Sequence, residues 1–122
     1  MLARFALVIY AFSLVSCHTS EPSLWTIGIV NPVTMREQVV DDFIVEMTEA
    51  GYIEGENIIY RYEGAIPDDT ERLAWARQLV AEEVDLIFAV ATPGAQTAAE
   101  ATDTIPIVFV PVTDPIGAGL VE

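Results

Sequence analysis

Apolar and polar positions follow two different periods along residues 24–122. Short apolar runs rich in strand-forming residues alternate with longer segments in which apolar side chains recur every three or four positions. The runs predict strands over residues 24–30, 58–63, 86–90 and 105–110, and the periodic segments predict helices over residues 34–50, 69–83 and 92–102. This βαβαβαβ order predicts an α/β fold built on a doubly wound parallel sheet with right-handed crossovers.

The ends of the predicted helices carry capping signals. Residues 34–37, Thr-Met-Arg-Glu, fit a capping box, and Gly51 suits the position after the first helix. Thr92 is expected as the N-cap of the third helix, with Pro93 at its first helical position. The third helix should therefore begin directly after the strand over residues 86–90.

The residue pattern also predicts where each strand lies in the sheet. The first strand is apolar throughout, which is typical of a parallel strand that is covered on both faces. The second strand becomes polar towards its end and is expected at or near an edge, whereas the fourth is expected to be buried. Trp75, in the second helix, is expected at the boundary of the core.

Three loops are candidates for binding chemistry: residues 31–33, 91–96 and 111–114. Each follows a predicted strand, and the carboxyl ends of parallel strands converge on the edge where doubly wound folds bind ligands. A ligand carboxylate would sit at the N-terminus of the third helix, because free N–H groups and the helix dipole favour an anion there. An ammonium group would sit near Asp114. Thr92 and Thr113 are also expected at these positions if they act only as ordinary caps and no ligand binds. The ligand-binding and the capping interpretations both stay open.

Several kinds of chemistry have no motif in this sequence. No GxGxxG follows the first strand and no GxxxxGK[ST] is present, so neither a dinucleotide site nor a P-loop is indicated. The single cysteine, Cys17, and the single histidine, His18, precede the α/β segment, which leaves no transition-metal cluster or Cys-His device within it. The net charge of -14, without any lysine, disfavours nucleic acid as a partner. We therefore expect no cofactor, no metal site and no enzyme activity.

Residues 1–16 differ in composition from the rest of the chain. They contain one charged residue, Arg4, and an apolar stretch that is too short to span a bilayer but fits a signal peptide. Residues 14–17, Leu-Val-Ser-Cys, resemble a bacterial lipobox, in which the cysteine is lipidated and begins the mature protein. We expect a lipoprotein signal peptide over residues 1–16, a lipidated tether over 17–23 and an α/β lobe over 24–122. A plain secretory signal with a chance cysteine is the alternative.

Five segments, taken together, resemble the substrate-binding lipoproteins of ABC transporters related to tryptophan- and phenylalanine-binding proteins. They are Ile-Gly-Ile at 27–29, EAGYIEGEN at 49–57, VDLIFAVATP at 84–93, TIPIVF at 104–109 and DPIGAGLV at 114–121. The resemblance implies a type I periplasmic-binding fold, in which two flavodoxin-like lobes enclose a small molecule in a hinged cleft. The ligand in such relatives is often an aromatic or other hydrophobic amino acid. The resemblance places only the first lobe, incomplete, in this chain.

By this resemblance the protein is the solute-binding component of an ABC importer. It would capture an amino acid or similar small molecule by lobe closure and deliver it to an ABC permease. It would be secreted across the inner membrane and held by its lipid anchor at the periplasmic or cell-surface face of a bacterial membrane. The first-lobe residues implied to line the cleft are Asn31, Thr92, Pro93, Gly94, Ala95, Thr113 and Asp114.

Three alternatives remain compatible with the same residues. The first is the ligand-sensing ectodomain of a signalling receptor, and the second is a non-functional truncated product, because the chain ends near the point where the family crosses to the second lobe. The third is an enzyme on a flavodoxin-like sheet, against which the missing nucleophile, metal cluster and phosphate loop count. Fold alone does not decide among them.

Overall fold

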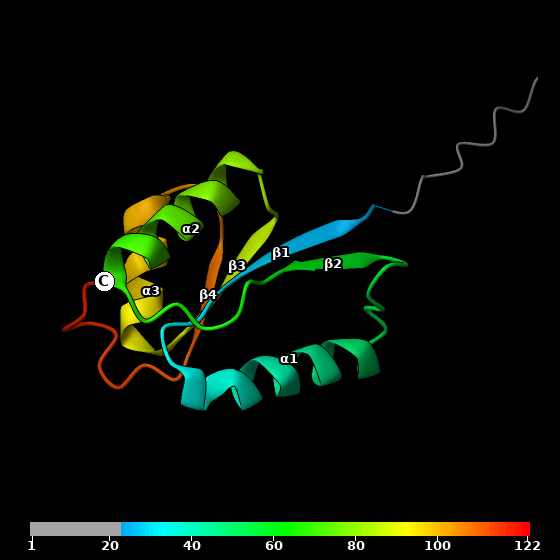
Figure 1. Cartoon of the computed structure of the whole chain (residues 1–122), viewed down its shortest axis with the longest axis horizontal. Coiled ribbons are helices and arrows are strands. Elements are labelled where there is room, and N and C mark those ends of the chain that lie inside the picture. Colours follow the sequence, from blue (N-terminus) through cyan, green and yellow to red (C-terminus); the bar gives the residue numbers. More distant parts are fainter. Residues whose placement is uncertain (1–22) are drawn as a thin grey trace, which may run out of the picture.

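The computed structural model describes residues 23–122, and these form a four-stranded parallel sheet with helices on both faces (Figure 1). In chain order the elements are β1 (Trp25–Val30), η1 (Thr34–Arg36), α1 (Glu37–Glu49), β2 (Ile58–Arg61), α2 (Asp69–Ala81), β3 (Leu86–Val90), α3 (Ala91–Ala101) and β4 (Ile107–Val110). The predicted α/β fold with a doubly wound parallel sheet is confirmed.

The strand order β2-β1-β3-β4 fixes where the chain reverses its direction of travel across the sheet. From β1 the chain passes through α1 to β2 on one side, and it then crosses back through α2 to β3 on the other side of β1. Figure 1 shows α1 on one face of the sheet and both α2 and α3 on the opposite face. The loops that leave β1 and β3 therefore part to opposite faces, and they open a crevice outside the carboxyl ends of these two strands.

The core consists of two apolar layers, one on each face of the sheet. Val30 packs with residues of α2 and α3, whereas its neighbour Ile29 packs with residues of α1. This separation follows from the strand period of two, which sends successive side chains to opposite faces. On the α1 face the ring of Phe43 stacks on that of Phe88, with centroids 3.9 Å apart. The expectation that the first strand is covered on both faces is confirmed.

Of the two predictions about the positions of the outer strands, one is confirmed and one is wrong. The expectation that the second strand lies at an edge is confirmed, because β2 is an outer strand. The expectation that the fourth strand is buried is wrong. β4 is the other outer strand of the described sheet, and Val108 within it is 45% exposed. An apolar run can mark an outer strand as well as a central one, since exposure depends on neighbours in space.

The predicted cap at Gly51 is confirmed, and the predicted capping box at residues 34–37 is wrong. Asp68 caps α2 by accepting a hydrogen bond from the N–H of Glu71 at 2.9 Å. Gly51 follows α1 with a φ of 97°, a left-handed conformation that suits glycine. The capping box at residues 34–37 does not form. Thr34 begins the short 3-10 turn η1 instead, and α1 starts after Arg36 without a side-chain cap.

Trp75 lies inside the core, so its predicted place at the boundary is wrong. Its side chain is only 4% exposed, and its indole Nε1–H donates to the carbonyl of Ile29 at 2.9 Å. Arg61 lies over the ring at 5.8 Å and forms a bidentate ion pair with Glu82. Hydrogen bonds from Arg61 lower the pKa of Glu82 to about 2. Because the indole N–H is satisfied inside the protein, the whole ring is buried at little polar cost.

The predictions for the N-terminal part of the chain lie outside the described residues. These are the signal peptide, the lipidation of Cys17 and nearly all of the tether. Among the helices of residues 23–122, none has both the length and the apolar character that crossing a bilayer requires.

Candidate functional site

The first turn of α3 packs directly on the end of β1. A Cβ atom at Gly94 would lie 3.0 Å from the carbonyl oxygen of Val30 and 3.2 Å from Cδ of Pro32. Only a glycine allows this approach of the two segments without a shift. Two of the three predicted loops, residues 31–33 and 91–96, therefore meet as expected. We call the place where they meet, residues 31–33 and 91–94, the β1/β3 crevice.

Asn31 organises the β1 side of this crevice. Its side chain is 1% exposed, with Oδ1 accepting from the N–H of Val33 at 3.0 Å and Nδ2 donating to the hydroxyl of Tyr62 at 3.2 Å. Its main-chain carbonyl accepts from the N–H of Ile66 at 2.8 Å. Burial raises the pKa of the Tyr62 hydroxyl, which stays protonated. Asn31 thus fixes the loop after β1 and joins it to the segment after β2.

The chain turns from β3 into α3 without an intervening loop. The helix begins at Ala91, and Val90 serves as its N-cap without a side-chain hydrogen bond. The expectations of Thr92 as N-cap and Pro93 at the first helical position are therefore wrong. Ala91 makes the sharp turn possible by adopting a φ of 59°, which costs a residue with a Cβ about 1–3 kcal/mol. Backbone strain of this kind is concentrated at functional sites.

This start leaves one main-chain donor at the crevice. The first backbone N–H groups of a helix have no intrahelical acceptor, and Pro93 has no N–H at all. The parallel pairing of Val90 with Val110 commits the N–H of Ala91 to the carbonyl of Val110, because Pro111 cannot donate, so the N–H of Thr92 remains. The positive end of the helix dipole lies at the same place. The arrangement can accept an anionic group such as a carboxylate.

The remaining predicted residues lie in different environments. Ala95 lies on the core side of α3 and is fully buried, so its side chain does not face the crevice. Thr113 and Asp114 are exposed in the segment after β4. The Asp114 carboxylate accepts from the N–H of Gly117 at 2.9 Å and so caps a turn. The sequence suggested capping by Thr92 and Thr113 and not by Asp114, and a contact of this carboxylate with a ligand stays a prediction.

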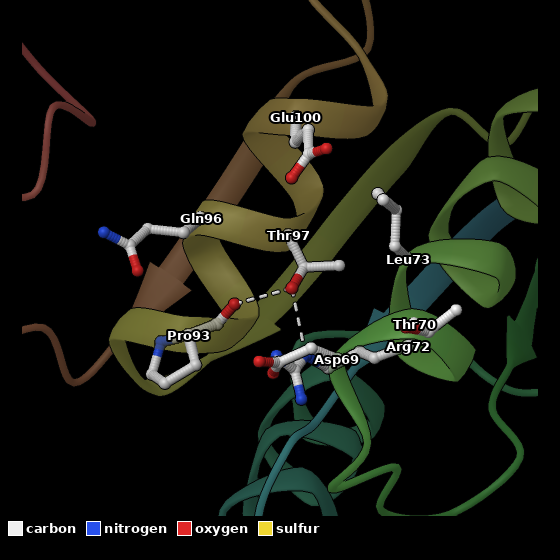
Figure 2. Close-up of a pocket in the computed structure, with 8 residues that line it drawn as sticks. All are labelled: Asp69, Thr70, Arg72, Leu73, Pro93, Gln96, Thr97 and Glu100. Carbon is white, nitrogen blue, oxygen red and sulfur yellow. Dashed lines mark hydrogen bonds and ion pairs between the residues drawn. The ribbon is translucent and has the colours of Figure 1, made fainter.

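A groove of about 530 Å³ lies between the first turn of α2 and the side of α3 that carries Pro93, Thr97 and Glu100 (Figure 2). It is lined by Asp69, Thr70, Arg72, Leu73, Pro93, Gln96, Thr97 and Glu100. Two of these residues, Arg72 and Thr97, are buried polar residues that sequence reasoning missed. The signal for Arg72 was its spacing, four residues before Ala76 and seven before Leu79, which places it on the buried stripe of α2. Within residues 23–122 no cluster of three potential metal ligands occurs.

The fold agrees with what comparison with known proteins finds. Residues 27–122 match the protein family described as ABC transporter substrate binding protein. The chain belongs to this family. A tyrosine-binding protein of Clostridioides difficile (strain R20291) is 41% identical over 80 residues, a match that covers 66% of this chain and 23% of that protein. The resemblance inferred from the sequence is thereby confirmed.

Solved structures give the same result for the fold. A ligand-free, open structure of a substrate binding protein with adhesive properties from Clostridium difficile matches with a TM-score of 0.72 and 32% identity, over 82% of this chain and 34% of that one. An ABC domain from Streptococcus pneumonia in complex with L-Trp matches with a TM-score of 0.72 and 31% identity, over 81% and 34%. The chain thus spans about a third of the length of each of these solved relatives.

Proposed function

We propose that this protein is the solute-binding component of an ABC importer and that residues 24–122 contribute one lobe of its ligand site. The observation that carries the proposal is the β1/β3 crevice, where strained Ala91 starts α3 at the edge of the sheet. Membership of the ABC substrate-binding family supports capture and delivery to a permease over catalysis. In this proposal a second lobe closes over the crevice and buries the ligand between the two.

The ligand that we propose is an amino acid with an aromatic side chain. Two relatives point to this class, one described as tyrosine-binding and one solved with L-Trp. The α-carboxylate would accept a hydrogen bond from the N–H group of Thr92, which the dipole of α3 strengthens. The α-ammonium would lie towards Asp114, the carboxylate in the segment after β4. The first binding determinant is thus the main chain of α3, and the second is a side chain.

Calorimetry with ligand analogues tests this proposal. We expect the complete protein to bind L-tyrosine or L-tryptophan, and tyramine, which lacks only the carboxylate of tyrosine, to bind about 100-fold more weakly or not at all. The reason is that the N–H group of Thr92 would be buried without an acceptor. The matched analogue 3-(4-hydroxyphenyl)propionate, which lacks the ammonium, isolates the contribution expected near Asp114. Absence of saturable binding for every amino acid contradicts the proposed function, and equal affinity for tyramine contradicts the carboxylate site.

We also propose that the protein is exported and held at the membrane by a lipid on Cys17. The support is the lipobox over residues 14–17, in which the single cysteine of the chain stands at the required position. Several acyl chains on one residue give stable anchoring, whereas one chain gives only marginal membrane binding. A lipid anchor of this kind would keep the binding protein close to its permease.

Replacement of Cys17 by alanine is expected to move the protein from the membrane pellet to the soluble fraction, because no thiol is left to accept the lipid. Fractionation followed by immunoblotting of the bacterial host measures this shift. Ser20→Ala, a change of similar size in the predicted tether, is the matched control and should stay in the pellet. If Cys17→Ala protein remains in the pellet, the anchor is not on Cys17.

A further inference from the structure

Three polar or charged residues are buried within residues 23–122: Asn31, Arg72 and Thr97, which are 1%, 3% and 7% exposed as whole residues. The Arg72 and Thr97 side chains are hydrogen-bonded to each other, and Asn31 is joined to them through the main chain of Ile66. A buried charge is costly unless it is fully hydrogen-bonded, and well-packed apolar residues stabilise a core at least as well. Stability alone therefore does not account for an arginine on the buried stripe of α2. The positions of the hydrogen-bond partners of this arginine account for it.

The Arg72 guanidinium has partners on three sides. Its Nε–H donates to the hydroxyl of Thr97 at 3.0 Å, and Nη1 donates to the carbonyls of Ile66 at 3.1 Å and Pro67 at 3.0 Å. Nη2 forms an ion pair with the Asp69 carboxylate. The Arg72 side chain is 4% exposed and that of Asp69 is 90% exposed. The arginine is thus enclosed, while its counter-charge stands in solvent.

Thr97 extends this network to the first turn of α3. Its hydroxyl accepts from Arg72 and donates to the carbonyl of Pro93 at 2.8 Å, as the dashed lines in Figure 2 show. On the other side, Ile66 donates its N–H to the carbonyl of Asn31 at 2.8 Å. One guanidinium therefore connects the segments that follow β1 and β2 with the helix turn that follows β3.

We propose that Arg72 is a positioning residue for ligand binding, acting through Thr97 on the first turn of α3. It holds the N–H group of Thr92 at a fixed distance from the loop after β1. Arginine suits this task because its planar fork carries five donors in a rigid arrangement, which a lysine does not reproduce. The inference rests on the proposed function, since it assigns this N–H group to a ligand carboxylate.

The test uses variants of Thr97 that separate the hydroxyl from the side-chain volume. Thr97→Val removes the hydroxyl at nearly constant size, Thr97→Ser restores it, and Arg72→Lys keeps the charge without the fork. Arg77→Lys, an exposed position on the same helix, is the control. Three quantities are measured on the complete protein: L-tyrosine affinity by calorimetry, hydrogen exchange of amides 91–97, and the urea midpoint of unfolding.

We expect Thr97→Val and Arg72→Lys to weaken L-tyrosine binding about tenfold and to speed hydrogen exchange in residues 91–97 more than in α1. Thr97→Ser should restore both, and Arg77→Lys should change neither. Unchanged affinity in Thr97→Val and Arg72→Lys overturns the inference while the proposed function stands. If the wild-type protein binds no amino acid, the proposed function fails, and hydrogen exchange alone decides whether Arg72 positions the turn. Equal acceleration in α1 and α3 indicates a merely structural role and overturns it.

Discussion

Replacing Trp75 by alanine is expected to lower the free energy of unfolding by about 3–5 kcal/mol, the range for large aromatic residues in a core. The indole is 4% exposed and packs with residues of β1, β3 and α3. Its loss leaves a cavity, removes the ring beneath Arg61 and leaves the Ile29 carbonyl without the indole donor. Urea unfolding followed by circular dichroism measures the change in unfolding free energy.

The chain provides its own control for this substitution. Trp25, in β1, is 47% exposed, and Trp25→Ala should cost less than about 1 kcal/mol. Trp75→Phe retains the aromatic ring but removes the Nε1–H donor to Ile29, and about 1–3 kcal/mol is expected for the unpaired buried carbonyl. Equal costs for the alanine variants at Trp25 and Trp75 would show that the helix α2 does not bury its tryptophan.

The order of elements could be predicted because it depends on local pattern alone. The apolar run at residues 27–30 and the helical spacing of Val39, Val40 and Phe43 each carry their own signal, and the structure confirms them. The burial of Trp75 could not be predicted in this way. Its hydrogen-bond partner, the carbonyl of Ile29, lies 46 residues away in the sequence, and only the packing of α2 on the sheet brings the two together.

The location of the candidate site could be predicted to the level of loops but not of individual contacts. Topology places the carboxyl ends of parallel strands on one edge, so residues 31–33 and 91–94 meet regardless of their side chains. The start of α3 was misplaced because Ala91 has a positive φ, which alanine rarely adopts. The bond between Arg72 and Thr97 joins α2 to α3 across 25 residues and has no local sequence signal.

Gly94→Val is expected to weaken L-tyrosine binding at least about 100-fold, which corresponds to about 2.7 kcal/mol of binding free energy. A Cβ at this position would lie 3.0 Å from the Val30 carbonyl and 3.2 Å from Cδ of Pro32. The Val30 carbonyl belongs to the central strand β1 and cannot move far, so the first turn of α3 must shift away. The N–H group of Thr92 moves with it. Overpacking of this kind also lowers unfolding free energy by about 1–3 kcal/mol.

A graded series separates the effect on the crevice from the effect on the helix. Gly94→Ala should fall between wild type and Gly94→Val in L-tyrosine affinity, since it adds the Cβ without the two methyl groups. Ala99→Val, on the exposed side of the same helix, introduces the same β-branched residue away from the crevice. It should cost only about 0.6 kcal/mol of helix propensity and leave binding unchanged. If Gly94→Val binds L-tyrosine like wild type by calorimetry, the ligand does not contact the first turn of α3, because its displacement then has no effect on affinity.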